Sequence, residues 1–389
     1  MKKVLLVPDS FKGTMSSAEI CAVMAESVRN FYPEAETVSI PVADGGEGSV
    51  DAFLAALGGE KKRVAVQGPF GRETPSFYGI LKNGTAVVEM AACAGLPLAG
   101  KEANPCLTTT YGAGELVKAA LDSGCARVIM AIGGSATNDG GCGAAAALGV
   151  KFYNEAGETF VPTGGTLHRI RSIDKSGLDP RLKNTELVTM CDIDNPLYGE
   201  NGAAFVFAPQ KGADPAMVRL LDDGLRHLAA IVKKDLSLDE AGAAGAGAAG
   251  GMGYGMKVFL NSSLRMGIET VLDTVNFDGL LKGSSVVFSG EGKIDRQSLR
   301  GKAVIGIARR AKKAGVPLVV LAGAVDDGIE EAYEEGVSAV FCINRRASDF
   351  SRPEMCAKGN LALAMDNILR IMQIKRPAAG GGMLNPRRE

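Results

Sequence analysis

The chain has 389 residues, and its 46% hydrophobic and 22% charged residues are typical of an ordinary soluble globular protein. Because 43 Lys and Arg nearly balance 44 Asp and Glu, the protein is not strongly basic, and we expect neither nucleic acid nor a membrane as a partner. A chain of this length exceeds what one hydrophobic core usually serves, so two domains are expected.

Cysteine and histidine usage and the first residues indicate where and how the protein works. The 8 cysteines are scattered without a C-x-x-C pair, which predicts reduced thiols instead of disulfides or a zinc site. Met1-Lys2-Lys3 leads directly into a short strand, unlike a signal peptide, and no apolar run approaches the roughly 20 residues of a membrane span. We therefore expect a cytoplasmic protein. Only 2 histidines occur, so histidine-based catalysis is not expected.

The N-terminal region contains two strand–loop–helix units. Residues 4–7 form a continuous apolar run, which is typical of a buried parallel strand. After a loop, the capping box Ser16-x-x-Glu19 predicts the beginning of a helix. A second strand, near residues 37–43, leads into Asp44-Gly45-Gly46-Glu47-Gly48 and a further helix.

The middle of the chain differs from its two ends. Residues 77–81 and 85–89 flank Lys82-Asn83-Gly84, which is a signal for an antiparallel hairpin. From residue 285 to residue 342, short apolar strands again alternate with helices, as in a doubly wound parallel sheet. We therefore predict an α/β protein in which a mixed α/β domain is inserted into a parallel one.

The parallel domain is predicted to be discontinuous and of Rossmann or flavodoxin type, comprising residues 1–67 and 284–376. The inserted mixed domain is expected at residues 68–283, and residues 377–389 are expected to form a disordered tail. We interpret the Ala/Gly-rich tract 241–255 as a flexible lid or hinge, because no strand precedes its G-x-G-x-x-G pattern.

A glycine-rich loop lies between a predicted strand at residues 127–132 and a predicted helix at residues 143–148. Glycines let backbone N–H groups crowd around an anion, and a helix N-terminus adds positive partial charge. The alternative is a tight strand–helix connection, which explains the glycines but not the polar residues among them. The loop therefore predicts a phosphate site made of Gly133, Gly134, Ser135, Thr137, Asn138 and Asp139.

Carboxylates also follow other predicted strands. Asp192 and Asp194 project to the same side and could both face one cation, although a simple turn would need only one acid. Glu291 and Asp295 lie just beyond a strand end, where ligands gather in parallel sheets, unless they are merely solvated acids of a turn. Lys12, in another strand-end loop, is either a surface lysine or a phosphate contact.

Seven motifs, in this order along the chain, resemble those of the bacterial glycerate kinase family. The resemblance extends from about Lys3 to Ile374. It implies ATP-dependent phosphorylation of D-glycerate, most often at the 2-hydroxyl, with Mg²⁺ and in the cytoplasm. It also implies two α/β domains with the site in the cleft between them. The motifs are residues 8–13, 43–48, 133–141, 191–197, 209–213, 250–255 and 290–295.

The residues in these motifs suggest roles in such a reaction. Asp295 is the expected general base, Lys12 is expected to stabilise the transferred phosphoryl group, and Asp192 with Asp194 is expected to bind Mg²⁺. The expected catalytic residues are Asp295, Lys12, Asp44 and Asp192. Besides the 133–139 loop residues, the expected substrate and phosphate contacts are Asp9, Ser10, Glu47, Glu291, Lys293 and Arg72.

A different class of function also fits an anion-binding site. The protein could be a non-catalytic sensor that binds a nucleotide or a sugar acid without turnover. The number of acids disfavours this alternative, because an anion alone does not need them. As partners we expect D-glycerate and ATP, and we leave a homodimer open.

Overall fold

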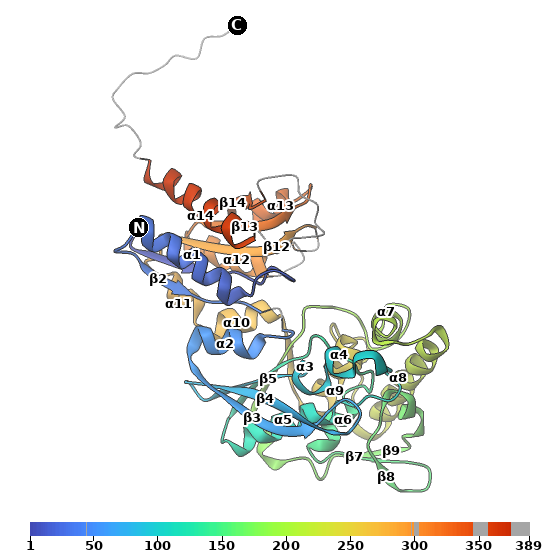
Figure 1. Ribbon diagram of the computed structural model, residues 1–389. Coiled ribbons are helices and arrows are strands. Elements are labelled where there is room, and N and C mark those ends of the chain that lie inside the picture. The colour runs from blue at the N-terminus through green and yellow to red at the C-terminus, as the bar shows by residue number, and fades with distance from the viewer. Residues whose placement is uncertain (44, 297, 299–302, 345–356, 375–389) are drawn as a thin grey trace.

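The computed structural model of the protein describes residues 1–43, 45–296, 298, 303–344 and 357–374. These residues form two lobes, each built around its own β-sheet (Figure 1). The chain begins in one lobe, crosses to the other, and returns to the first, so that α14 (Ala357–Gln373) lies beside α1 (Ser17–Phe31).

The first sheet joins the two ends of the chain. The pairing of its N-terminal strand with the C-terminal segment begins at Val4 opposite Val286. The predicted parallel sheet formed by both chain ends is therefore confirmed. Its five strands are parallel and follow the order β14 (Val337–Cys342), β13 (Leu318–Val325), β12 (Val286–Ile294), β1 (Lys3–Leu6) and β2 (Glu36–Ser39).

Helices cover both faces of this sheet. Val4 and Leu6 pack into a core cluster with residues of α1 and α14. Leu5 belongs to a different cluster, on the face covered by α12 (Ala303–Ala314). Burial on both faces explains why Val4, Leu5 and Leu6 of β1 are all apolar. The predicted capping box is also present, since the Ser16 side chain accepts a hydrogen bond from the Glu19 N–H group.

The second sheet is mixed. Its first three strands in the chain form antiparallel pairs, and the Asn-Gly signal is confirmed as the turn of a hairpin, in which Gly84 has a φ of +79°. The other pairs are parallel. The six strands follow the order β11 (Ser263–Arg265), β10 (Glu186–Met190), β6 (Arg127–Ala131), β5 (Thr85–Glu89), β4 (Glu73–Leu81) and β3 (Gly59–Gln67).

Helices and a small sheet complete the two lobes. The first lobe also contains α13 (Glu330–Glu335). The second contains α3 (Ala91–Ala94), α4 (Leu96–Ala99), α5 (Tyr111–Asp122), α6 (Cys142–Ala147), α7 (Ala203–Phe207), α8 (Pro215–Leu236), α9 (Ala248–Leu260), the short 3₁₀ turns Gly100–Glu102, Gly164–Arg169, Pro180–Asn184 and Pro209–Lys211, and a three-stranded sheet of β8 (Thr159–Phe160), β7 (Lys151–Tyr153) and β9 (Ser172–Asp174).

One hydrophobic core continues from the first sheet into the second. It contains Leu5 of β1 together with Val87 of β5 and Ile129 of β6. Helices α2 (Ser49–Leu57), α10 (Gly267–Thr274) and α11 (Phe277–Leu281) lie between the two sheets and contribute to the same cluster (Figure 1). The lobes are therefore packed against each other and not merely joined by linkers.

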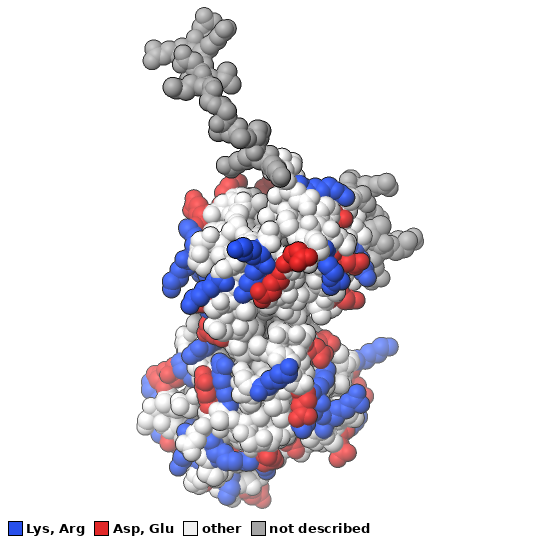
Figure 2. Space-filling view, turned by 90° about the vertical axis from the view of Figure 1, so that its left-hand side faces the viewer, with Lys and Arg blue, Asp and Glu red and all other residues white. Residues whose placement is uncertain are grey.

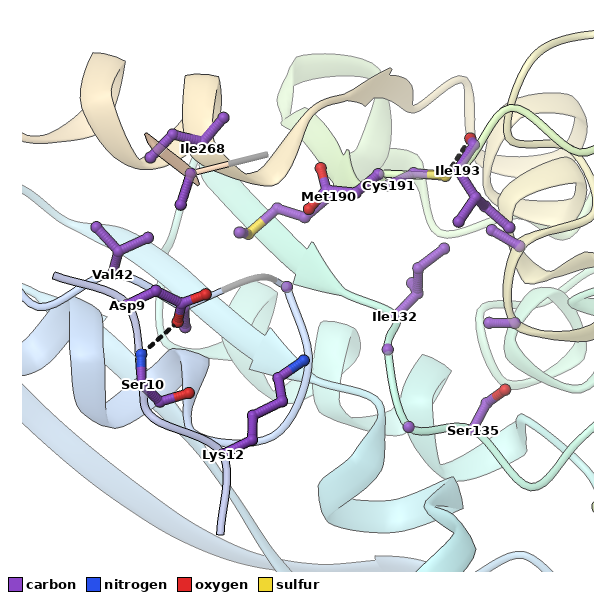
Figure 3. A pocket seen from close by; sticks show the side chains of 18 of the residues that line it. Asp9, Ser10, Lys12, Val42, Ile132, Ser135, Met190, Cys191, Ile193 and Ile268 are labelled. Atoms are coloured by element: carbon purple, nitrogen blue, oxygen red, sulfur yellow. Dashed lines mark hydrogen bonds between the residues drawn. The ribbon is translucent and has the colours of Figure 1, made fainter. Parts of the chain in front are cut away.

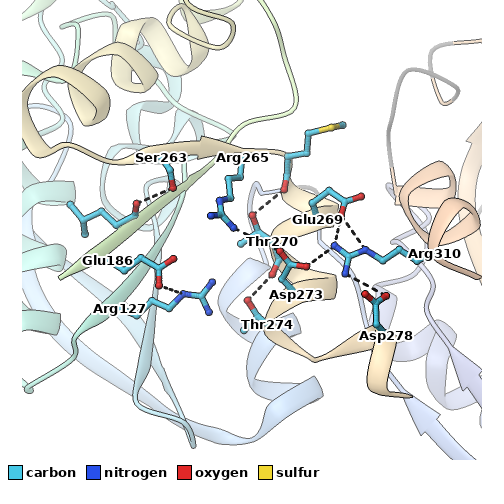
Figure 4. A network of polar contacts seen from close by, with 12 residues as sticks. Arg127, Glu186, Ser263, Arg265, Glu269, Thr270, Asp273, Thr274, Asp278 and Arg310 are labelled. Carbon is cyan, nitrogen blue, oxygen red and sulfur yellow. Dashed lines mark hydrogen bonds and ion pairs between the residues drawn. The ribbon is translucent and has the colours of Figure 1, made fainter. Parts of the chain in front are cut away.

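A charged network reinforces this junction (Figure 4). The Arg310 guanidinium of α12 bonds to Glu269 and Asp273 of α10, with 2.6 Å between Nη2 and Asp273 Oδ1, and lies 3.7 Å from Asp278 of α11. The Arg310 side chain is 17% exposed, which limits screening by water. Because α10 directly follows β11, the network attaches the end of the second sheet to the first lobe.

The predicted domain division at residues 67 and 283 stays a proposal. It assigns β3 to the first domain, whereas β3 pairs with β4 throughout its length in the second sheet. The expected tail at 377–389 lies outside the described residues.

In the described part of the chain, no helix is long and apolar enough to cross a membrane. Figure 2 shows acidic and basic side chains interspersed over the visible face.

Candidate active site

A pocket of about 850 Å³ is lined by residues from both lobes (Figure 3). It lies beyond the carboxyl ends of β1, β6 and β10, where parallel sheets place ligands. The first lobe contributes Asp9, Ser10, Lys12, Val42, Ala43, Gly45, Glu291, Gly292, Lys293, Asp295 and Ala303. The remaining lining residues are Leu96, Ile132, Gly133, Gly134, Ser135, Met190, Cys191, Asp192, Ile193, Phe207, Gln210, Lys211, Ala248, Ala249 and Ile268.

The loop after β1 supplies the first wall of the pocket. The Asp9 N–H group donates to the Gly290 carbonyl at 2.8 Å, and the Asp9 carboxylate accepts from the Ser10 N–H group at 2.6 Å. Asp9 is 8% exposed, so its carboxylate is held within this loop. Lys12 is exposed, and Figure 3 shows its side chain extending across the pocket toward the side that carries Ile132 and Ser135.

The segment with Glu291 and Lys293 is a strand and not the expected loop. The strand β12 continues to Ile294 because β13 runs beside it, pairing Glu291 with Ala322 and Lys293 with Ala324. The predicted strand, which ended before Glu291, was therefore too short. Gly290 keeps this strand close to the first loop, since an added Cβ atom would lie 3.3 Å from the Phe11 ring.

Polar contacts connect the acids at the end of β12. The Ser298 N–H group donates to Asp295 Oδ1 at 3.1 Å, and Ser298 Oγ lies 3.4 Å from Glu291 Oε1. Lys293 Nζ is 2.7 Å from Asp326 and 3.8 Å from Asp295, and its hydrogen bond with Asp326 raises the pKa of Lys293. Sequence reasoning missed Ser298, although the Asp-x-x-Ser spacing is a signal for such a turn.

The glycine-rich loop forms part of the opposite wall. The Gly133 N–H group donates to the Gly45 carbonyl at 2.9 Å, and an added Cβ atom on Gly133 would lie only 2.8 Å from the Gly46 Cα atom. Glycine is therefore required here because two loops from different lobes touch backbone to backbone. Gly134 and Ser135, two of the residues predicted to contact phosphate, also line the pocket.

The structure places Thr137, Asn138 and Asp139 outside the pocket lining. All three are fully buried. Asp139 accepts hydrogen bonds from Thr110 and from the N–H groups of Gly141 and Gly143, at 2.7–3.2 Å. Burial raises the pKa of the Asp139 carboxyl group, while these donors act in the opposite direction. The Asp139 carboxylate therefore occupies the N-terminus of α6, where the sequence analysis had predicted a phosphate group.

The two acids after β10 differ in position. Asp192 lines the pocket, and its Oδ1 atom accepts a hydrogen bond of 2.6 Å from the N–H group of Gly267, the first residue of α10. Asp194 is exposed and does not line the pocket. Across the described ranges, no group of three or more His, Cys, Asp and Glu side chains is arranged to hold a metal.

Three further predicted site residues, the contacts Glu47 and Arg72 and the catalytic candidate Asp44, are not among the described residues that line the pocket. Glu47 and Arg72 are exposed and do not line it, and Asp44 lies outside the described residues. The helix that follows the 44–48 loop is already capped, because the buried Glu89 carboxylate accepts from Gly48 at 3.2 Å and from Val50 at 2.5 Å. Glu89, a residue of the second lobe, thus accepts hydrogen bonds from the N–H groups at the N-terminus of α2.

Lys211 was overlooked as a site residue, although it belongs to the motif at residues 209–213. It is 2% exposed, and its Nζ atom donates to Ser135 Oγ at 2.8 Å and to the Thr137 carbonyl at 2.7 Å. Burial lowers the pKa of Lys211 to about 7. Its neighbour Gln210 also lines the pocket. The sequence offers little to show that Lys211 lines the pocket, apart from its position between Gln210 and Gly212 in this motif.

The glycine-rich tract expected to be a lid is packed inside the second lobe. Most of α9 is buried, and its first turn is distorted, with positive φ at Ala249, Gly250 and Gly251. A Cβ atom on Gly250 would lie 2.0 Å from the Thr137 carbonyl oxygen. The glycines therefore permit close contact with the 137–141 loop. The burial of most of this tract argues against a lid, and its use as a hinge stays a prediction.

Comparisons with known proteins agree with this geometry. The model of the glycerate kinase family matches residues 4–373. A glycerate kinase from Bacillus cereus is 44% identical over 96% of this chain and 98% of its own length, and the glycerate 2-kinase of Escherichia coli is 42% identical over 97% and 100%.

A solved structure shows the same fold. It belongs to a protein from Salmonella typhimurium LT2 described as a glycerate kinase 2, with a TM-score of 0.87 and 37% identity over 96% of this chain and 98% of that one. The likeness extends over almost the entire length of each relative. We conclude that the chain belongs to the glycerate kinase family and is a kinase.

Proposed function

We propose that the protein transfers the γ-phosphoryl group of ATP to D-glycerate with Mg²⁺, forming 2-phosphoglycerate in preference to 3-phosphoglycerate. The observation that carries this proposal is the pocket between the lobes, in which lysines and carboxylates face a glycine-rich loop. The glycerate 2-kinase from E. coli supports the choice of substrate and hydroxyl. Membership in a kinase family makes the sensor alternative less favourable.

Asp295 and Lys12 are the proposed catalytic residues. A secondary hydroxyl is a poor nucleophile, so a carboxylate within reach should accept its proton as the new bond forms. Asp295 lines the pocket and is oriented by the Ser298 N–H group. Lys12 extends into the same pocket, where a cation stabilises the negative charge of the transferred phosphoryl group (Figure 3).

The pocket also fits the requirements of Mg²⁺. This ion usually binds one or two carboxylates together with phosphate oxygens and water, so a complete protein cage is not needed. Asp192 is the proposed ligand because it lines the pocket, and Asp194 remains the second candidate. Bound Mg²⁺ would neutralise charge on the phosphates, while the protein orients the two substrates.

The cellular setting and the assembly are also proposals. The seven cysteines in the described part of the chain are free thiols, as expected of a cytoplasmic protein. We propose a cytoplasmic location on this basis. A homodimer stays a proposal that analytical ultracentrifugation would test.

A coupled assay of ADP release tests the proposed reaction. We expect turnover with ATP, Mg²⁺ and D-glycerate, and loss of turnover when the metal is chelated. Phosphorus NMR of the product should show 2-phosphoglycerate as the main species. ADP release that is independent of the added acid, or binding of ATP without turnover of any hydroxy acid, would contradict this proposal and support a sensor.

A further inference from the structure

Lys211 is a buried cation whose described partners are all neutral. Its ammonium group donates to one hydroxyl and one carbonyl, and these are the contacts it makes with the described residues. Asp139 is the acid that favours its charged form, but the Asp139 carboxylate is engaged with the two helix N-termini. An ammonium group has three N–H donors, so Lys211 can make one more hydrogen bond.

The Ser135 hydroxyl group can also donate one further hydrogen bond. Because an ammonium group can only donate, Ser135 Oγ must act as the acceptor in its contact with Lys211. The O–H hydrogen then points elsewhere, and no described residue accepts it. The Gly134 and Ser135 N–H groups likewise donate to no described acceptor. Gly134, Ser135 and Lys211 all line the pocket, and the contact of Lys211 with Ser135 places these donors in the same part of its wall.

The surroundings of these donors distinguish between a phosphate and the carboxylate of a small acid. Leu96 and Phe207 line this part of the pocket, and the Leu96 N–H group donates to the Gly134 carbonyl. Phe207 lies four residues before Lys211, just before the turn that carries it. Apolar walls beside an anion site suit the base and ribose of a nucleotide, whereas a three-carbon acid offers little apolar surface to bury.

We propose that Lys211, the Ser135 hydroxyl and the N–H groups of Gly134 and Ser135 form a subsite that binds a phosphate group of the nucleotide substrate. This proposal rests on the proposed use of a nucleotide. Lys211 has a double role in it, since it holds the 135–137 loop in place and supplies the positive charge. The lowered pKa supports this reading, because an anion beside a buried ammonium group restores its charged form.

Calorimetric titration of purified variants with ADP, inorganic tripolyphosphate, adenosine and D-glycerate tests the subsite. Lys211→Met removes the charge but keeps a similar shape. We expect it to weaken binding of ADP and tripolyphosphate about tenfold to hundredfold, the usual effect of losing a charge-assisted hydrogen bond. Affinity for adenosine and D-glycerate should stay within about twofold, since those ligands lack the phosphate group.

Two further variants make the result interpretable. Lys175 serves as a control, because it is half-buried, donates to a backbone carbonyl as Lys211 does (that of Val258, at 2.9 Å), and lies outside the pocket lining. Lys175→Met should leave all four affinities unchanged. If Lys211→Met does not fold, Ser135→Ala serves in its place and should weaken tripolyphosphate binding about threefold to tenfold, as expected for one neutral hydrogen bond.

The possible outcomes separate this proposal from the kinase reaction. If wild type binds tripolyphosphate and Lys211→Met binds it equally well, the subsite is wrong, whatever the enzyme phosphorylates. If the variant instead loses affinity for D-glycerate and keeps its affinity for tripolyphosphate, Lys211 belongs to the D-glycerate site and the proposal is overturned. If wild type binds tripolyphosphate through Lys211 but does not phosphorylate D-glycerate, the subsite stands and only the substrate assignment fails.

Discussion

At the scale of single residues, the carboxylates of the pocket differ in the partners that the fold provides. Asp295 and Asp192 both line the pocket, but their partners differ. Asp295 lies beside Lys293 and Ser298 at the end of β12, whereas Asp192 accepts from the first N–H group of α10. We propose on this basis that Asp295 accepts the proton and that Asp192 is the metal ligand.

Substitution of the two acids should separate their roles. Asp295→Asn should lower kcat by about 10²–10⁴ and leave the affinity for Mg²⁺–ATP unchanged, because only the proton acceptor is lost. Asp192→Asn should raise the Mg²⁺ concentration needed for activity, and additional metal should partly restore it. The measurements are steady-state kinetics over a range of Mg²⁺ concentrations. Rescue of Asp295→Asn by metal, but not of Asp192→Asn, would show that the roles are reversed.

Lys211 should also make stability depend on pH. Its pKa is about 7 in the folded protein and near the ordinary 10.5 when unfolded, so the unfolded chain binds more protons between these values. The free energy of unfolding of wild type should therefore rise relative to Lys211→Met as pH increases through this window. Urea titrations of both proteins at several pH values measure the difference.

A lysine with the opposite environment is the control for this effect. The pKa of Lys62 is raised, chiefly by its hydrogen bond with Glu60, so the group stays protonated in both states over the lower part of this window, where Lys211 already titrates. Lys62→Met should therefore show a constant difference from wild type. A constant difference for Lys211→Met as well would mean that Lys211 keeps an ordinary pKa in the folded protein.

At the scale of elements, the glycine-rich segments serve mainly to let backbones approach one another. The 133–135 loop touches the 45–46 loop, and the distorted start of α9 packs on the 137–141 loop. In both places an added Cβ atom would meet the backbone of another segment, which cannot move aside as easily as a flexible side chain. The 133–141 loop is thus packed against two other glycine-rich segments, the 45–46 loop and the start of α9.

Two glycine substitutions test this role of α9. Gly250 and Gly124 have similar φ values of +70° and +80°, but only Gly250 has backbone atoms within contact distance of an added Cβ atom. Gly124→Ala should cost about 1 kcal/mol, from its left-handed conformation alone. Gly250→Ala should cost about 1–3 kcal/mol more, from overpacking. Equal unfolding free energies in urea would mean that α9 moves freely away from the loop.

At the scale of the whole molecule, the two lobes behave as one packed body around their shared core. Residues of both sheets and of α2, α10 and α11 belong to the same hydrophobic cluster, and Arg310 joins α10 and α11 to α12. Motion that closes the pocket on its substrates is still expected, because bulk water would compete for the phosphoryl group. Such motion would have to preserve this core.

Unfolding should therefore be cooperative across the two lobes. The protein contains no Trp, and of its 7 tyrosines, Tyr78, Tyr111 and Tyr254 are among those in the second lobe. Tyrosine fluorescence thus reports mostly on that lobe, while far-ultraviolet circular dichroism reports on both. We expect the two signals to give the same urea midpoint. Separate midpoints would indicate two independent folding units.

Local patterns were sufficient for much of this description. The apolar run at 4–7, the capping box at Ser16 and the Asn-Gly turn at 83–84 predicted elements that the structure contains, because each depends on contacts within a few residues. The order of the motifs also indicated the kinase family. The end of β12 was misjudged, since its last residues are held by β13 and not by their own sequence.

Tertiary structure alone determined which polar residues face the pocket. Asp139 and Lys211 both lie in predicted motifs, yet one is a buried cap for two helices and the other contacts Ser135, which is 76 residues away in the chain. A local pattern cannot distinguish these cases, because burial and the choice of partner depend on segments that meet only in the folded protein. The sequence therefore identified the loops that meet at the site, and folding selected the side chains that line it.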